Sequence, residues 1–123
     1  MNFTELEVWK KARIFRNEMH EFCKTLPSVE KYALKDQLLR ASRSVTANIA
    51  EGHGRFHLKE NIQFCRIARG SLSEVLDHLI CAYDCSYMQK EDLEKYQIQI
   101  NEVNRIMNGY INYLKSQLIK PKN

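Results

Sequence analysis

Residues 93–114 read LEKYQIQINEVNRIMNGYINYL, and apolar side chains return in this stretch at alternating intervals of three and four positions. This spacing places them along one face of an α-helix, and its persistence over three heptads is typical of helices that pack side by side at a shallow angle. The face consists of Leu93, Tyr96, Ile100, Val103, Met107, Tyr110 and Leu114. The stretch therefore predicts a long helix, over about residues 91–117, that lies against neighbouring helices.

Three further helices are predicted upstream of this stretch. Apolar residues recur at the same spacing over about residues 4–26, 29–51 and 57–85. The four predicted helices have similar lengths, and the connections between them are short. Short connections make successive helices run in opposite directions, so the sequence predicts an all-α fold, an antiparallel up-down-up-down four-helix bundle, in a single domain over residues 1–123.

Residues that favour helix ends mark the boundaries of the first two helices. Thr4 followed by Glu7 matches a capping box, in which each side chain satisfies a backbone amide at the start of a helix. Ser28 is a candidate cap for the second helix. Gly52 is expected to end the second helix in the left-handed conformation that glycine adopts readily.

The composition excludes several classes of protein. Of the 123 residues, 44% are hydrophobic and 28% are charged, which is typical of a folded domain and not of a disordered chain. Four glycines and two prolines are too few for the frequent turns of a β-sandwich or barrel. The N-terminus has no apolar signal-peptide segment, and no stretch is apolar for long enough to cross a membrane. We therefore expect a cytoplasmic protein with four reduced cysteines and no membrane association.

A basic face is predicted on the first helix, roughly opposite its apolar face. Its members share three-and-four spacing and are Lys10, Arg13, Asn17, His20 and Lys24. The whole chain carries a formal charge of +4, and the excess lies in residues 1–73, which hold thirteen basic and eight acidic residues. A row of cations displaces the counterions of a nucleic acid, so the four basic residues are candidate contacts to RNA or DNA. Simple solvation of a charged helix face is the alternative interpretation.

The last helix carries a second row of apolar residues, which consists of Ile98, Ile106 and Tyr113. The row lies roughly a third of a turn from the main apolar face, and the interior of one bundle cannot hold both. These residues are therefore candidates for an interface between copies of the chain. The alternative is that they line the groove with a neighbouring helix.

The sequence contains no motif that predicts catalysis, a metal centre or a cofactor. No Gly-x-Ser-x-Gly or Gly-x-x-x-x-Gly-Lys motif occurs, and no histidine follows a glutamate by three positions as in di-iron bundles. His78, Cys81 and Cys85 lie on neighbouring turns of one helix, but we interpret them as buried or interfacial side chains and not as zinc ligands. We therefore expect a protein that is not an enzyme and that binds no metal or cofactor.

Charged residues also fall within segments that are otherwise apolar or small. Arg40 and Glu51 lie on one face of the second helix, with Asn48 beside them, and Arg69 lies among the apolar residues of the third. An unpaired charge is costly in such surroundings, so we expect Arg40 or Arg69 to pair with Glu51 of a neighbouring helix or subunit. Arg55, in the glycine-containing segment between the second and third helices, is a further candidate contact to an anion.

Three sequence motifs resemble those of one family. Residues 40–55, RASRSVTANIAEGHGR, resemble the central motif of the bacterial 23S rRNA intervening-sequence proteins. Residues 6–12, LEVWKKA, resemble the opening of these proteins, and residues 67–74, IARGSLSE, resemble their third-helix motif. The resemblance covers about residues 3–115. It gives a structural role to the motif residues Arg40, Asn48, Glu51, Gly52 and Arg69.

The resemblance implies a four-helix bundle that assembles into a homopentameric ring and has no enzymatic activity. The family is also distantly similar to the accessory proteins of diversity-generating retroelements, which are basic bundles that bind a reverse transcriptase and nucleic acid. We therefore interpret the chain as a non-catalytic oligomer that binds RNA or DNA through a basic outer face and serves as a scaffold for another protein, such as a reverse transcriptase. A protein–protein interaction module without nucleic-acid binding is the alternative.

Overall fold

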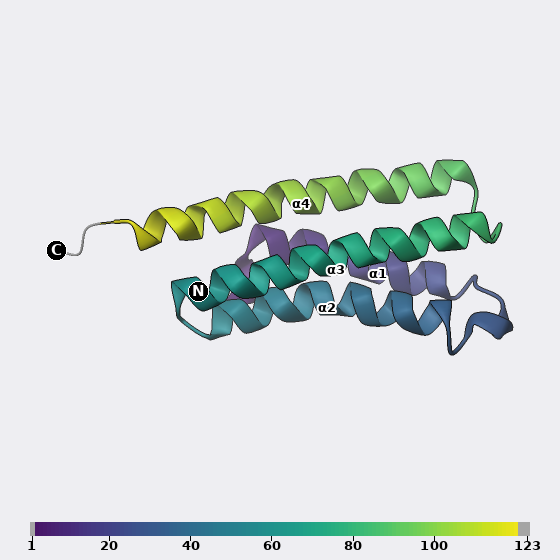
Figure 1. Cartoon of the computed structure of the whole chain (residues 1–123), viewed down its shortest axis with the longest axis horizontal. Helices are drawn as coiled ribbons and strands as arrows, with labels where there is room; N and C mark the ends of the chain where they lie inside the picture. The colour runs from purple at the N-terminus through teal and green to yellow at the C-terminus, as the bar shows by residue number, and fades with distance from the viewer. Residues whose placement is uncertain (1, 121–123) are drawn as a thin grey trace.

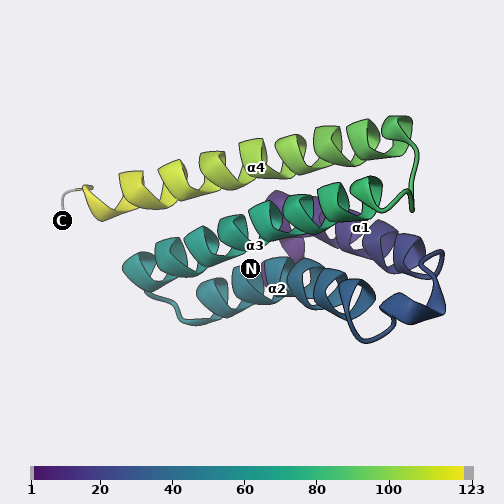
Figure 2. The same ribbon diagram turned by 45° about the vertical axis from the view of Figure 1, so that its right-hand side comes forward.

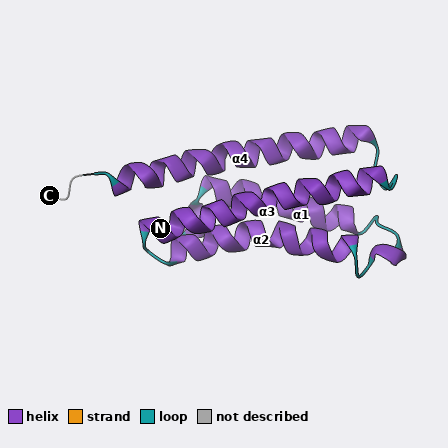
Figure 3. Ribbon diagram, in the orientation of Figure 1, coloured by secondary structure: helices purple, strands orange, loops and turns teal. Residues whose placement is uncertain are grey.

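The computed structural model describes residues 2–120 and consists mainly of four long helices. These are α1 (Glu7–Cys23), α2 (Leu34–Gly54), α3 (Leu58–Asp84) and α4 (Lys90–Leu118). Successive helices run in opposite directions, with their axes nearly aligned (Figure 1). No strand occurs among the described residues (Figure 3). The predicted four-helix bundle is confirmed, and the predicted bounds of the last two helices lie within one residue of those observed.

The chain enters α1 through a short 3-10 helix, η1 (Phe3–Glu5). Asn2 caps η1, because its Oδ1 accepts a hydrogen bond from the Thr4 amide at 3.0 Å and its own amide donates to Glu5 Oε2 at 3.1 Å. The predicted capping box of Thr4 and Glu7 is therefore wrong. The box is built two residues earlier and caps η1, and α1 follows after one extended residue.

The second long helix begins five residues later than predicted. Residues 28–30 form another 3-10 helix, η2 (Ser28–Glu30), and the N-cap residues of η2 and α2, Pro27 and Ala33, form no side-chain cap hydrogen bond. The expectation that Ser28 caps the second helix is therefore wrong. Instead, Glu30 Oε1 accepts a hydrogen bond from the backbone amide of Leu34, the first residue of α2, at 3.3 Å. Glu30 also accepts a bond from the Tyr87 hydroxyl, 2.9 Å away, which ties this turn to the α3–α4 connection.

The core is formed by the apolar faces of all four helices. The predicted face of α4 lies inside, with Leu93, Tyr96 and Tyr110 half-buried and the other members buried. Ile111 is buried as well, although the heptad pattern did not include it. The residues of α1, α2 and α3 with the least exposed surface include Val8, Met19, Leu38, Val45, Ile49, Leu72, Val75 and Leu79.

Neighbouring helices do not pack equally closely. Of the contacts between long helices, the one between α2 and α3 is the most extensive and the one between α1 and α4 is the least extensive. Figure 2 shows α2 and α3 close together near the turn that joins them and diverging toward the opposite end. Gly52 of α2 lies at the close contact with α3. A Cβ atom added there would lie 2.8 Å from Phe64 Cβ and 3.2 Å from the backbone oxygen of Asn61. A glycine at this position therefore lets the two helices approach each other.

The second long helix continues beyond Gly52, whose φ angle is not positive. The prediction that Gly52 ends the helix in the left-handed conformation is therefore wrong, and close packing against α3 explains the glycine instead. The left-handed position belongs to Phe56, with a φ angle of 57°. The Phe56 amide donates to the backbone oxygen of His53 at 3.4 Å. This backbone conformation costs a residue with a side chain about 1–2 kcal/mol.

Candidate nucleic-acid interface

The outer face of α1 presents its polar residues to solvent. All five predicted members are exposed, namely Lys10, Arg13, Asn17, His20 and Lys24. Lys24 pairs with Glu21 at 2.7 Å, and this ion pair holds the pKa of the Glu21 carboxyl below its ordinary value. Because both side chains are largely exposed, the pair is weak, and Lys24 can exchange it for a phosphate. The guanidinium of Arg13 lies over the Trp9 ring, 5.6 Å from its centroid.

Two arginines that were not among the candidate contacts extend this basic face across the α1–α2 groove. Arg16 of α1 and Arg43 of α2 line a cavity of about 430 Å³ together with His20, and no carboxylate is among the described residues that line it. Arg16 is held in place, since its Nη1 donates to Thr46 Oγ1 at 3.2 Å. Helical spacing from Arg13 identifies Arg16, but only the fold brings Arg43 beside it. We call this cavity the basic groove.

A polar network joins α2 to α3. Arg40 pairs with Glu74, and Nε2 of His78 lies 3.0 Å from the same carboxylate. The hydrogen bond with His78, followed by that with Arg40, holds the pKa of Glu74 below its ordinary value. Further along α2, Asn48 Nδ2 donates to the backbone oxygen of Ser44 at 2.8 Å. The motif residues Arg40 and Asn48 therefore form interactions inside one chain, Arg40 with α3 and Asn48 with its own helix.

The expected pairing of Arg40 or Arg69 with Glu51 is wrong within the chain. Glu51 pairs with Arg55, one helical turn later, at 3.0 Å. Arg69 instead donates from Nη1 to Asn108 Oδ1 of α4 at 2.8 Å. Arg55 also lies 3.7 Å from Glu60, so two carboxylates compensate the charge of this candidate anion contact.

The second apolar row of α4 does not form one continuous exposed face. Ile98 is 69% exposed and Tyr113 is 57% exposed, whereas Ile106 is half-buried and packs against the core. Ile98 and Ile14 line a cavity of about 260 Å³ between α1 and α4. Gln99, in the wall of the same cavity, has a buried Oε1 without a hydrogen-bond partner among the described residues. Tyr113 lies near the α2–α3 turn instead.

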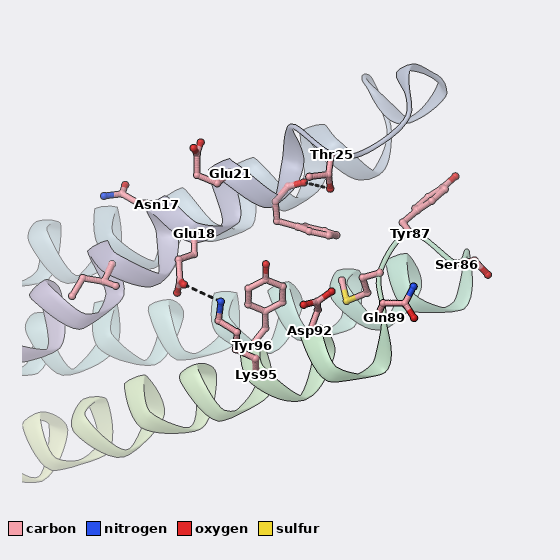
Figure 4. A pocket seen from close by; sticks show the side chains of 13 residues that line it. Asn17, Glu18, Glu21, Thr25, Ser86, Tyr87, Gln89, Asp92, Lys95 and Tyr96 are labelled. Carbon is pink, nitrogen blue, oxygen red and sulfur yellow. Dashed lines mark hydrogen bonds and ion pairs between the residues drawn. The ribbon is translucent and has the colours of Figure 1, made fainter.

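A larger cavity, of about 870 Å³, lies between α1, α4 and the α3–α4 connection (Figure 4). Two aromatic rings in it, those of Phe22 and Tyr96, meet edge to face with centroids 5.8 Å apart. Lys95 pairs with Glu18 at 3.6 Å across the helices. The remaining acidic residues that line the cavity are Glu21 and Asp92. This acidic rim repels phosphate, and it adjoins the basic face of α1, because Asn17 also lines the cavity. We call it the acidic groove.

The four cysteines are all thiols, which confirms the expectation that none forms a disulfide. Cys23 and Cys65 are buried, and burial raises the pKa of each thiol to about 11. Cys81 and Cys85 are exposed, so neither is buried within the single chain, and the alternative that they are interfacial stays a prediction. Among residues 2–120, no three His, Cys, Asp or Glu side chains gather in a way that could hold a metal ion. No helix in the described part of the chain is both long and apolar enough to cross a membrane.

Comparison with known sequences connects this geometry to a family. Residues 4–109, which include all three sequence motifs, match the family described as 23S rRNA-intervening sequence protein. The chain belongs to this family. No curated protein matches the chain.

Among solved structures, the bundle is similar to a protein of unknown function from the S23 ribosomal protein family of Bacteroides thetaiotaomicron VPI-5482. The two share 24% sequence identity and a TM-score of 0.78, and the similarity covers 85% of this chain and 95% of the other. This similarity supports the fold. Neither the family description nor that of the solved structure names a catalytic activity.

Proposed function

We propose that this member of the intervening-sequence protein family is a non-catalytic oligomer, the homopentamer that its sequence motifs imply, and that it binds RNA or DNA as a scaffold. The observation that carries the nucleic-acid role is the continuity between the exposed cations of α1 and the basic groove. Arg16, His20 and Arg43 line that groove, and no described carboxylate lines it. Glu21 pairs with Lys24 at one end of the face, but the other basic side chains and the groove together form a surface with an excess of positive charge, which attracts a polyanion.

The dimensions of the basic face fit several consecutive phosphates. From Lys10 to Lys24 the face rises about 21 Å, at about 1.5 Å per residue. This length corresponds to roughly six nucleotides of one strand, at about 3.4 Å for each. Arg16 and Arg43 add two guanidinium groups beside the face, and a guanidinium can bind phosphate oxygens in a bidentate manner. The interface therefore recognises the backbone of a nucleic acid and not its base sequence.

The test is the salt dependence of RNA binding by the wild-type protein and the triple variant Lys10→Ala, Arg13→Ala, Lys24→Ala. The wild-type affinity is expected to fall steeply with rising salt. Removing three phosphate contacts should reduce the slope of log K against log salt by about 2–3. The matched control is Lys31→Ala, Lys90→Ala, Lys95→Ala, which removes the same charge from exposed positions elsewhere.

The control variant should keep the wild-type slope. Equal slopes for both triple variants would show that only net charge matters, and an affinity indifferent to salt would refute an electrostatic interface. Wild-type protein that binds neither RNA nor DNA would refute the nucleic-acid role altogether.

Docking of another protein is the second candidate function, and the surface between α1 and α4 favours it. Ile14 and Ile98 are both exposed there, and the buried Gln99 Oε1 lacks a donor among the described residues. A partner that covers this surface would bury both isoleucines and could supply the missing hydrogen bond. Light scattering of the wild type and of Ile14→Ser, Ile98→Ser tests whether the partner is another copy. A wild-type monomer at micromolar concentration would refute self-assembly.

A further inference from the structure

We infer that the end of the bundle where the α2–α3 turn meets the last turns of α4 binds unpaired nucleotides, with bases on Phe56 and Tyr113 and phosphates at Lys59 and Lys120. The inference rests on the proposed function, because it takes a nucleic acid as the ligand, and it adds a site apart from the basic face of α1. The last turns of α4, drawn in yellow, extend past the α2–α3 turn (Figure 1).

Two adjoining cavities occupy this end. The first, of about 600 Å³, has aromatic and imidazole rings from both elements in its lining, namely His53, Phe56, His57, Tyr110 and Tyr113. The second, of about 580 Å³, shares Phe56 and His57 with the first and adds Lys59 and Lys120. Cavities of several hundred Å³ accommodate small organic ligands. A nucleotide could therefore place its base in the first cavity and its phosphate in the second.

Phe56 adopts a strained backbone conformation for a residue with a side chain. Its φ angle of 57° is one that glycine adopts without strain, and its side chain is 86% exposed, so little burial compensates the cost. A strained backbone that displays an aromatic ring to solvent points to a role for the ring in binding. The His53 ring lies beside it, with centroids 6.4 Å apart.

The ring of Tyr113 packs against Tyr110, which a hydrogen bond holds in position. Its ring stacks on that of Tyr110, with centroids 6.4 Å apart and planes inclined by 17°. The Tyr110 hydroxyl in turn accepts a hydrogen bond from Asn61 Nδ2 at 3.0 Å, and Asn61 is only 7% exposed. Tyr113 itself remains more than half exposed. The phenol ring is therefore held in place before a base stacks on it, which limits the entropy lost on binding.

The charge of this end favours a nucleic acid over a second copy of the chain. No carboxylate is among the described residues that line either cavity. Nearby, Glu51 and Glu60 share the single guanidinium of Arg55, which leaves one negative charge against the two lysines. Lys59 and Lys120 form no ion pair within residues 2–120. Two such ends would repel each other. Aromatic rings flanked by cations bind single strands, whose bases are available for stacking, whereas the bases of a duplex are already stacked on one another.

The experiment compares a single-stranded RNA of about 12 nucleotides, which carries 2-aminopurine, with the duplex of the same sequence. The variants are Phe56→Gly, which suits the backbone at this position, and Tyr113→Ala. Tyr32→Ala is the matched control, because Tyr32 is an exposed aromatic residue outside both cavities. Each test variant should bind the single strand about 5- to 150-fold more weakly than wild type and lose the fluorescence change that reports base stacking. Duplex affinity should not change, and Tyr32→Ala should behave as wild type.

The outcomes separate this inference from the proposed function. Wild-type protein that binds neither RNA form would overturn both proposals. Single-strand binding that Phe56→Gly and Tyr113→Ala leave unchanged would overturn only the inference. A change in particle mass when Phe56 or Tyr113 is replaced, measured by light scattering, would show that this end contacts another copy, and it would overturn the inference as well.

Discussion

Replacing Gly52 with alanine tests the packing of the bundle most directly. The new Cβ would lie 2.8 Å from Phe64 Cβ and 3.2 Å from a backbone oxygen of Asn61. Both atoms are close to or part of the α3 backbone, so a side-chain rotation cannot relieve the clash and the two helices must move apart. Overpacking of this kind costs about 1–3 kcal/mol.

Gly70 and Gly109 provide matched controls. Both lie within long helices, and a Cβ added at either one meets no atom within 4 Å. Gly70→Ala and Gly109→Ala should each stabilise the protein by up to about 1 kcal/mol through helix propensity. Gly52→Ala receives a similar gain but also suffers the clash, so it should be less stable than either control by about 1–3 kcal/mol.

The assay is thermal or urea unfolding, followed by circular dichroism at one protein concentration, because association adds to stability by mass action. A difference of 1 kcal/mol corresponds to roughly 3–6 °C in Tm for a domain of this size. Gly52→Ala is expected to unfold at the lowest temperature of the three variants. A Gly52→Ala midpoint equal to those of Gly70→Ala and Gly109→Ala would refute the explanation of Gly52 by close packing.

Three further predictions follow from local chemistry. Phe56→Gly should leave the free energy of unfolding unchanged or raise it by up to about 1 kcal/mol, because glycine removes the backbone strain and little burial is lost; clear destabilisation in urea would contradict this. The folded-state pKa of Glu74 lies below its ordinary value of 4.5, so its contribution to stability is present above that pH and is lost as the pH falls. Between about pH 5 and about pH 3, the wild type should therefore lose stability more steeply than Glu74→Gln, and parallel curves would argue against this contribution. Cys81 and Cys85 should react with a maleimide in the native protein, whereas the two buried thiols, with a pKa of about 11, should react only after unfolding; mass spectrometry counts the labels.

The helices could be predicted from the sequence because their apolar residues recur over many turns. The helix predicted from the heptads of residues 93–114 agrees with α4 within one residue at each end. Four of the seven heptad residues are buried, and the other three are half-buried against the core. The starts of the first two helices are less predictable, because Thr4 and Ser28 are equally suited to cap a long helix or to lie in a 3-10 turn. The rest of the fold determines which of the two structures forms. In this protein the 3-10 helices η1 and η2 occupy the residues predicted to form the first turns of the first two long helices.

The candidate site could be predicted only where its residues come from one helix. The basic face of α1 follows from spacing alone, whereas Arg43 and Arg16 meet only after α1 and α2 pack together. The predicted partner of Arg40 is wrong for a similar reason, namely that the observed partner comes from a different helix. Glu51 shares a helix face with Arg40, but it lies only one turn from Arg55, and the fold brings Glu74 of α3 to Arg40 instead.

The contact between the first and last helices, α1 and α4, is the least extensive of the contacts between long helices in the bundle. α2 and α3 are consecutive in the chain, so their hairpin can form from local contacts, whereas closing α1 against α4 must bring distant segments together. Deuterium should therefore enter the amides of α1 and α4 before those of the α2–α3 hairpin. A molecule that binds across the contact between α1 and α4 would therefore stabilise the closed bundle and slow the separation of these two helices.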